Sequence, residues 1–459
     1  VFNSGERVEG YTNFLWLILL AAAGKIGLPV VMTARILSFV LTLATLLLSG
    51  YAVRNPAREI GYHTWSGALC LFLPPMLLAA SAPLSAWALS GTEIPLFTSL
   101  LLLGFIFLRE GRSSVSVFAL FGLLGLVRPE GLLFYGMAGI SLLLRAKKKR
   151  VLLEGVGLFA ALYAPYLIWK WSYFGSLLPN TFYAKTGPLG IMIDNGSRYA
   201  AAFIASYGYL LPLGLLLFKR RVREWHVALP ASFVLAHWLS ITTLGGDWMP
   251  HYRLLLPTLP LAVIVAVEGL FAAGRASRDK PAGPKIGDPI PIVASMLVIL
   301  MMLPGGLDYD RFRTERVTVR AFAHLGQRLR EMLPPSTSLG LGSTGAIGYY
   351  TDMRIVDILG LTDAHIARNG RIVASQPGHM KTDGAHVLSL KPDLLLLGNV
   401  QIHRGRRGED MMRLKVQEQD IARLPAFDAD YEFVNIPLGD GFFLSCYKRK
   451  DYFLPLGGD

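Results

Sequence analysis

The chain has 459 residues, of which 53% are hydrophobic and only 17% are charged, a composition that excludes an ordinary soluble enzyme and indicates a membrane protein. Its net charge of +13 would suit a nucleic-acid partner, but the excess lies almost entirely in the apolar part of the chain. Residues 1–304 hold 25 Lys and Arg against 13 Asp and Glu, whereas residues 305–459 hold 20 against 19. We therefore expect membrane lipids, and no nucleic acid, as partners.

The first apolar segment, 11–23, is shorter than the ~20 residues that a helix needs to cross a bilayer core. A span here would also place the basic residue Arg54 outside, against the rule that basic loops face the cytoplasm. We therefore predict an amphipathic helix that lies at the outer interface, with Tyr11 and Trp16 as its anchors.

About ten apolar runs follow, and charge density rises only after residue 304. We predict a polytopic α-helical membrane domain, 1–304, and a soluble C-terminal α/β domain, 305–459. Two of the runs, 113–127 and 131–145, are short and are expected to form thin or tilted spans. The full set is 30–53, 63–80, 93–108, 113–127, 131–145, 151–170, 197–218, 226–243, 253–272 and 289–304.

Basic residues collect in alternate loops, which assigns those loops to the cytoplasm. They are Arg54, Arg58, Arg109, Arg112, Arg145, Lys147, Lys148, Lys149, Arg150, Lys219, Arg220, Arg221, Arg223, Arg275, Arg278, Lys280 and Lys285. The opposite loops hold nearly all of the unusual polar motifs, and they are 1–29, 81–92, 128–131, 171–196 and 245–253. Since the motifs gather on one face, we predict a single site there, with the 305–459 domain on the same outer side. Scattered turn residues are the alternative.

The densest polar segment lies between two apolar runs and reads Gly245-Gly246-Asp247-Trp248-Met249-Pro250-His251-Tyr252-Arg253. Charged groups at a membrane boundary are costly unless they bind or react. Arg253 is predicted to bind a phosphate with its planar guanidinium, with an interface anchor as the alternative. Asp247 is a candidate for binding substrate hydroxyls, assisting a base or holding an ion, or else for capping a turn. His251 is expected to pair with the phosphate or with Asp247, or simply to pack within the loop.

Other outer loops supply further substrate-binding candidates. Arg128 and Lys185 occupy positions comparable to that of Arg253, although Arg128 also suits a salt bridge to Glu130. Glu93 begins a span and either faces the site or favours a helix N-terminus. The remaining candidates are Asn180, which suits a substrate contact or a Pro-Asn turn, and the rings of Tyr183, Trp248 and Tyr252, which suit flat substrate faces and membrane interfaces alike.

Metal and nucleotide motifs give no further lead. HExxH and paired-cysteine spacings are absent, so the metal is unassigned and a divalent cation stays open. Cys70 lies in an apolar run and Cys446 in the C-terminal domain, so no intramolecular disulfide is expected. A nucleotide-sugar donor and ATP-driven transport have no support, because neither GxGxxG nor a Walker loop is present.

The C-terminal domain shows mixed periodicity. Helices are expected at 316–332, 360–368 and 380–390, and strands at 338–341, 354–358, 393–397, 431–436 and 442–447. Such a domain suits the binding of a second substrate. The candidates for its binding surface are Asp363, His365, His379 and Lys381, with ordinary loop residues as the alternative.

Several motifs occur together in order. They are VEGYTN at 8–13, SGTE at 90–93, RPEG at 128–131, PNTFYAK at 179–185, GDW at 246–248 with Arg253, GAIGYY at 345–350, DILGLTD at 357–363 and GH at 378–379. Together they resemble the polytopic bacterial glycosyltransferases of the GT-C superfamily, and among them the terminal arabinofuranosyltransferase (AftB-like) group. The resemblance covers nearly the whole chain and is specific for the family, not for the sugar.

The resemblance implies transfer of a sugar, arabinofuranose or another pentose or hexose, from a polyprenyl-phosphate donor. The acceptor is then an envelope glycan, lipid or protein at the outer face of the bacterial inner membrane. The family's catalytic base is an acid in the first outer loop, just after the first span. This chain begins at Val1, without a signal peptide, in what reads as that loop, so we expect the first span and the base to lie upstream. Glu6 and Glu9 resemble the tail of that loop.

We therefore predict a glycosyltransferase. The main alternative is a non-catalytic relative that serves as an assembly factor of an envelope machine. A lipid-linked sugar transporter is a weaker alternative, because it would need charged residues within the spans, and here they lie at the ends.

Overall fold

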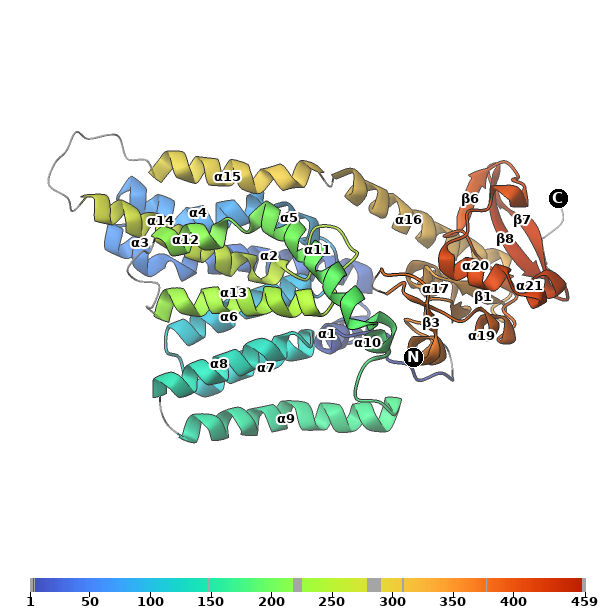
Figure 1. Cartoon of the computed structure of the whole chain (residues 1–459), viewed down its shortest axis with the longest axis horizontal. Helices are drawn as coiled ribbons and strands as arrows, with labels where there is room; N and C mark the ends of the chain where they lie inside the picture. The colour runs from blue at the N-terminus through green and yellow to red at the C-terminus, as the bar shows by residue number, and fades with distance from the viewer. Residues whose placement is uncertain are drawn as a thin grey trace. The chain divides into compact units, whose positions relative to one another are not determined.

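The computed structural model describes residues 3, 5–146, 149–217, 225–278, 290–307, 309–376 and 378–455. The chain forms two compact units (Figure 1). The helical unit comprises Thr12–Ile168 and Met192–Phe312, and the mixed unit comprises Val1–Tyr11, Trp169–Ile191 and Arg313–Asp459. Several of the basic residues assigned to the cytoplasm lie outside the described residues, namely Lys147, Lys148, Lys219, Arg220, Arg221, Arg223, Lys280 and Lys285.

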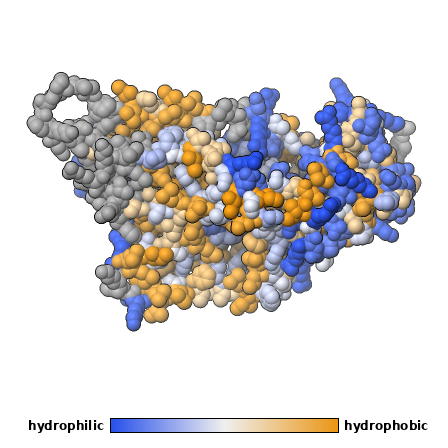
Figure 2. Space-filling view, viewed as in Figure 1, coloured by the Kyte–Doolittle hydropathy of each residue, from blue (hydrophilic) through white to orange (hydrophobic). Residues whose placement is uncertain are grey.

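The helical unit is a bundle of apolar helices that pack side by side (Figure 1). Its helices, of which α9 and α11 extend into the mixed unit, are α1 (Phe14–Lys25), α2 (Val30–Ala52), α3 (Arg54–Ile60), α4 (Trp65–Ala80), α5 (Ala82–Trp87), α6 (Ile94–Arg109), α7 (Ser114–Val127), α8 (Gly131–Ala146), α9 (Lys149–Phe174), α11 (Leu189–Tyr207), α12 (Leu210–Leu217), α13 (Trp225–Thr243), α14 (Leu259–Arg278) and α15 (Ile290–Leu307). Long apolar side chains remain exposed on them, such as Leu47 and Leu153, and Figure 2 shows hydrophobic residues over much of the face it presents. Such a surface fits a membrane protein.

Two of the described helices, α2 and α9, are long and apolar enough to cross a membrane by length and composition, and eight shorter apolar helices accompany them. The apolar runs of the sequence thus form helices, while their number of crossings stays a prediction. One run is not continuous. The expected span at 197–218 is divided into α11 and α12 at Gly208, where the backbone of the preceding turn lies too close for a side chain.

The prediction for the first segment was wrong in two respects. Helix α1 is apolar around its whole circumference rather than amphipathic. Trp16 is no interface anchor, because it is buried in the core and its indole N–H donates to the Gly91 carbonyl at 3.2 Å. A buried tryptophan needs such a partner for its N–H group.

The mixed unit contains a six-stranded sheet. Its elements are α10 (Asn180–Lys185), α16 (Tyr309–Met332), β1 (Ser338–Leu341), α17 (Thr344–Thr351), β2 (Arg354–Asp357), α18 (Ala364–Asn369), β3 (Arg371–Ile372), β4 (Lys381–Thr382), α19 (Gly384–Ser389), β5 (Leu394–Leu395), β6 (Gln401–Arg404), α20 (Val416–Ala422), α21 (Pro425–Asp430), β7 (Tyr431–Gly439) and β8 (Phe442–Arg449). Strand β1 is parallel to β2 and β5, and β8 is antiparallel to β5, β6 and β7. The five predicted strands are confirmed with small shifts, whereas β3, β4 and β6 were not predicted.

Two hydrophobic clusters cover the two faces of this sheet. At β5, Leu394 and Leu396 join the cluster that includes α16, whereas Leu395 and Leu397 join the cluster that includes α19 and α20. Successive side chains of a strand point to opposite faces, so a continuous apolar run is what a strand covered on both faces requires.

Candidate functional site

Three charged side chains from two loops of the helical unit form one buried cluster. The Arg128 guanidinium donates from Nη1 to Glu93 Oε1 at 2.5 Å and from Nη2 to Glu130 Oε1 at 2.7 Å. Asn13, at the start of the unit, donates to the other Glu93 oxygen at 3.0 Å. The motifs SGTE, RPEG and VEGYTN, which are far apart in the sequence, therefore meet through their polar side chains.

The backbone conformation of two glycine-containing turns determines where these charged side chains lie. Gly131 begins α8 so close to α7 that a Cβ would lie 2.4 Å from the carbonyl carbon of Leu124, and its N–H donates to the Arg128 carbonyl at 2.9 Å. In the SGTE turn, Gly91 has φ +73°, and Glu93 directly precedes α6. Both turns thus depend on a glycine that a larger residue cannot replace without strain.

Electrostatics keep the acids of this cluster ionised. Burial alone would raise the pKa of both carboxyls, but the adjacent Arg128 guanidinium holds the pKa of Glu93 and of Glu130 below its usual range. The charge of Arg253 contributes to the same lowering at Glu93. The GDW loop with its arginine therefore lies close enough to act on the cluster.

That loop is organised around an ion pair between its two ends. Arg253 donates from Nε to Asp247 Oδ2 at 2.5 Å and from Nη2 to Oδ1 at 3.2 Å. The Asp247 side chain is only 5% exposed and also accepts the backbone N–H of Trp248 at 3.0 Å. The capping role weighed for Asp247 is thus present together with a two-point arginine contact.

Helix α11 supports the loop from one side. The Tyr199 hydroxyl accepts the Leu254 N–H at 3.2 Å, and its ring lies 5.9 Å from that of Tyr252. Gly246, at φ +65°, lies against Tyr199, and a Cβ would approach it to 2.7 Å. His251 is buried within the same loop, and the Trp248 carbonyl accepts from Arg311 at 2.5 Å.

The PNTFYAK candidates belong to the mixed unit and are used within it. The Asn180 side-chain N–H groups donate to the carbonyls of Gly360, Leu361 and Asp363 at 2.9, 3.1 and 3.2 Å. Tyr183 accepts Lys381 Nζ at its carbonyl. The Asn180 contacts attach α10 to the loop that follows β2, and the Lys381 contact attaches it to β4. The role of Asn180 as a donor ligand stays a prediction.

The remaining PNTFYAK and acceptor candidates are also placed. Lys185 is half-buried beside Gly378. The Tyr183 ring lies 4.6 Å from the Arg368 guanidinium. Lys381 is buried rather than on the surface, because its ammonium donates to two backbone carbonyls, and burial lowers its pKa.

Asp363 and His365 each pair with a residue of α19 or its N-cap. Asp363 contacts His386 at 3.1 Å, and His365 contacts Asp383 at 2.9 Å. The two imidazoles stack with their centroids 4.1 Å apart. His379 lies in the loop before β4, where its carbonyl accepts from Gln417. The two pairs hold α18 and α19 together.

Sequence reasoning missed a buried ion pair in the mixed unit. Lys170, near the end of α9, lies 2.9 Å from Glu9, and both side chains are at most 5% exposed. The signal was present, since a lysine within an apolar run needs a partner. The backbone of Glu9 also accepts the N–H of Asn180 at 3.0 Å, so the pair joins the VEGYTN and PNTFYAK motifs.

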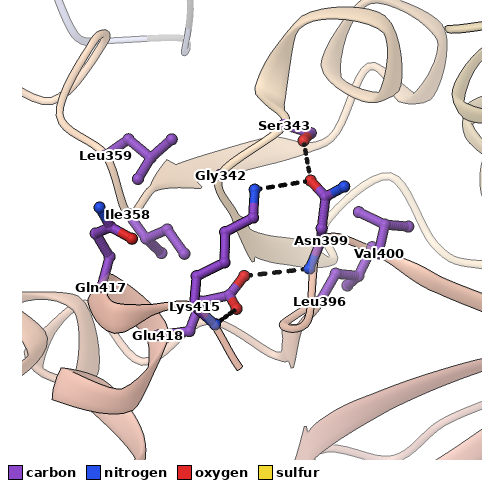
Figure 3. Close-up of a pocket in the computed structure, with 10 residues that line it drawn as sticks. All are labelled: Gly342, Ser343, Ile358, Leu359, Leu396, Asn399, Val400, Lys415, Gln417 and Glu418. Atoms are coloured by element: carbon purple, nitrogen blue, oxygen red, sulfur yellow. Dashed lines mark hydrogen bonds between the residues drawn. The ribbon is translucent and has the colours of Figure 1, made fainter. Parts of the chain in front are cut away.

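A pocket in the mixed unit was also missed. It lies where β1, β2 and β5 end, and it is lined by Gly342, Ser343, Ile358, Leu359, Leu396, Asn399, Val400, Lys415, Gln417 and Glu418 (Figure 3). Asn399 Oδ1 accepts from both Ser343 Oγ and Lys415 Nζ at 3.1 Å. Ligands of α/β domains commonly bind at the carboxyl ends of parallel strands. In the part of the chain that the structure describes, no group of three or more His, Cys, Asp or Glu is arranged to hold a metal ion.

The chain is similar to known proteins in sequence and in fold. Residues 310–453 match a domain of unknown function, DUF8728. The chain is 29% identical over 318 residues, 61% of its length, to a terminal beta-(1->2)-arabinofuranosyltransferase of Corynebacterium glutamicum. It is 31% identical over 244 residues, 49% of its length, to the protein of the same name in Mycobacterium tuberculosis. The resemblance to this group is confirmed.

These alignments span 46% and 38% of the two relatives, so the chain covers less than half the length of the curated proteins it matches. The fold is similar to that of ArnT from Cupriavidus metallidurans, with a TM-score of 0.54 over 97% of this chain and 90% of that chain, at 13% identity. This similarity confirms the predicted GT-C-like helical fold with a C-terminal domain that contains a sheet.

Proposed function

We propose that the chain transfers arabinofuranose from a polyprenyl-phosphate donor to an envelope glycan acceptor at the outer face of the bacterial inner membrane. The names of the relatives support the sugar, and the apolar helices support the membrane setting. The observation that carries the proposal is the charged site of the helical unit, in which Glu93, Arg128, Glu130, Asp247 and Arg253 lie together.

The chemistry requires a cation at the leaving phosphate. In the transfer, the bond between the sugar C1 and the phosphate oxygen breaks, and a bond from C1 to the acceptor oxygen forms. The acceptor proton passes to a base, and the lipid phosphate departs with one additional negative charge. A guanidinium that contacts this phosphate therefore stabilises the transition state more than the bound donor, which raises kcat.

Arg253 suits this role best. Two of its nitrogens are bound to Asp247, and Nη1 makes no hydrogen bond to any residue that the structure describes. The two-point contact fixes the plane of the guanidinium and leaves one edge for a phosphate oxygen. Asp247, the possible catalytic residue of the sequence analysis, orients Arg253 in this scheme. Both of its carboxylate oxygens accept from Arg253, so we do not assign it as the base.

The Glu93–Arg128–Glu130 cluster supplies sugar recognition. Both carboxylates are held ionised by Arg128, which makes them weak bases and good hydrogen-bond acceptors. Glu130 Oε2 is buried and accepts no hydrogen bond from the described residues. Buried polar atoms without a partner are rare, so this oxygen is our candidate for a sugar hydroxyl.

The test is transfer by the natural protein that carries this sequence, expressed full length and reconstituted in proteoliposomes. Polyprenyl-phosphate arabinofuranose and a short arabinofuranoside acceptor are supplied, and the product is detected by mass spectrometry. Arg253→Lys is expected to lower kcat about 10- to 100-fold with little change in KM, because a point charge replaces an oriented fork. Arg198→Lys, in an exposed pair with Asp194, is the matched control. Transfer that Arg253→Lys leaves unchanged excludes the phosphate role. No transfer from any polyprenyl-phosphate sugar would favour the assembly factor.

A further inference from the structure

A buried tryptophan that the sequence analysis did not single out contacts the Asp247–Arg253 loop at two points. Trp87 ends α5 and is only 7% exposed. Its indole N–H donates to the His251 carbonyl at 3.1 Å. The face of its ring lies 6.0 Å from the Arg253 guanidinium carbon. This is within the range of a cation–π contact.

The loop needs such support because its backbone is strained. His251 and Tyr252 have φ values of 58° and 49°, and neither is glycine. A left-handed residue of this kind is unfavourable and persists only where its surroundings hold it. Arg253 follows directly, so the conformation of these two residues sets the direction in which its side chain leaves the backbone.

Trp87 also begins the turn that carries Glu93. Its carbonyl accepts the Ser90 hydroxyl at 2.8 Å and the Ser90 N–H at 3.2 Å. The same residue thus contacts Arg253 through its side chain and supports the SGTE turn through its backbone. It joins the two parts of the charged site.

We propose that Trp87 is a positioning residue that acts through Arg253, by holding the strained His251–Tyr252 backbone and the guanidinium face. It contacts no reacting atom itself. This inference rests on the proposed function, because it assigns Arg253 to the leaving phosphate. A misdirected guanidinium loses stabilisation of the transition state before it loses affinity for the donor.

The test compares Trp87→Phe with Trp238→Phe in the transfer assay. Trp238 is equally buried, and its indole N–H donates to the Thr258 hydroxyl at 3.2 Å rather than to the loop. Trp87→Phe is expected to lower kcat about 10-fold, with KM within 2-fold of wild type, since it removes one hydrogen bond and weakens the cation–π contact. Trp238→Phe is expected to keep kcat within about 2-fold. In an Arg253→Lys background, Trp87→Phe is expected to change kcat less than 2-fold further, because coupled residues are not additive.

The outcomes separate this inference from the proposed function. Unimpaired Trp87→Phe beside impaired Arg253→Lys overturns the positioning role and leaves the proposed function standing. Losses that multiply in the double variant also overturn the role, because Trp87 then acts independently of Arg253. Unimpaired Arg253→Lys instead refutes the phosphate role of Arg253, and with it the positioning role of Trp87, whereas absence of transfer by the wild type refutes the proposed function. If Trp87→Phe unfolds at a lower temperature than Trp238→Phe, the variant Trp87→His is measured as well, because its ring restores an N–H donor. Recovery of kcat with this variant supports positioning, and a stable Trp87→His protein without recovery refutes it.

Discussion

Replacing Arg128 with alanine tests whether the charged cluster is a balanced ion network. The substitution leaves Glu93 and Glu130 without their cation, although their side chains are only 10% and 13% exposed. Removal of one partner from a buried ion pair costs about 3–5 kcal/mol. Because the carboxylates retain some access to water, we expect the lower end of that range, about 3 kcal/mol.

The loss of stability in Arg128→Ala is expected to depend on pH. Arg128 lowers the pKa of both carboxyls in the folded protein, so its stabilisation is present above their unfolded pKa of about 4.3 and disappears as pH falls through the lower folded value. The stability difference between wild type and Arg128→Ala is therefore expected to be full at pH 7 and to shrink below about pH 4.

Buried cysteines provide the assay. Cys70 lies in α4 of the helical unit and Cys446 in β8 of the mixed unit, and both thiols are buried. In a Cys446→Ala background, a thiol-reactive fluorophore then reports unfolding of the helical unit through Cys70 as the temperature rises. Arg198→Ala is the control, since its pair with Asp194 is 78% and 58% exposed and is expected to contribute little.

A second variant decides whether unpaired charge is the cause. Adding Glu93→Gln and Glu130→Gln to Arg128→Ala removes the buried charges and is expected to recover part of the lost stability. If Arg128→Ala unfolds at the wild-type temperature, or if the triple variant is no more stable than Arg128→Ala, the reasoning is refuted.

Three further predictions concern the mixed unit. Lys170→Gln is expected to destabilise the mixed unit by about 3 kcal/mol, because the buried Glu9 carboxylate loses its cation. The double variant Lys170→Met with Glu9→Leu is expected to lose less stability, and equal losses of stability in thermal unfolding would contradict this. Asn180→Ala removes three hydrogen bonds to backbone carbonyls and is expected to cost about 1–3 kcal/mol, seen as faster proteolysis within 357–363; unchanged cleavage would speak against it. Burial raises the pKa of Cys446 to about 12, so maleimide at pH 8 is expected to label this thiol only after unfolding, and labelling of the native protein, detected by mass spectrometry, would disprove the burial.

That the polar motifs SGTE and RPEG lie close together was predictable, because an apolar chain has few positions at which charged side chains are tolerated. A charged residue at a membrane boundary needs a partner, and the loops that we predict to face outward contain few other charged residues. Local spacing suggested the Arg128–Glu130 pair, which is two residues apart. The second partner, Glu93, is 35 residues away and became visible only when α6 and α7 packed together.

Tryptophans were the least predictable part of the site. In an apolar segment, Trp16 and Trp87 have the same pattern as lipid-facing anchors, because hydrophobicity does not reveal which carbonyl an indole N–H will reach. Only the folded backbone shows that one donates to Gly91 and the other to His251. The break at Gly208 was not predicted for a related reason, since an apolar run has the same hydrophobic pattern with or without a turn inside it.

The charge balance of the site supports our proposal of Arg253, rather than Arg128, as the phosphate ligand. Three carboxylates, those of Glu93, Glu130 and Asp247, face the two cations Arg128 and Arg253. Arg128 is enclosed by two of these carboxylates, so an anionic phosphate approaching it would meet net negative charge at short range. Among the described residues, Arg253 forms an ion pair with one carboxylate, and its exposed fraction of 19% exceeds the 12% of Arg128. Within the proposed function, a phosphate therefore gains most at Arg253, and Arg128 is assigned to keep two buried carboxylates ionised for sugar hydroxyls.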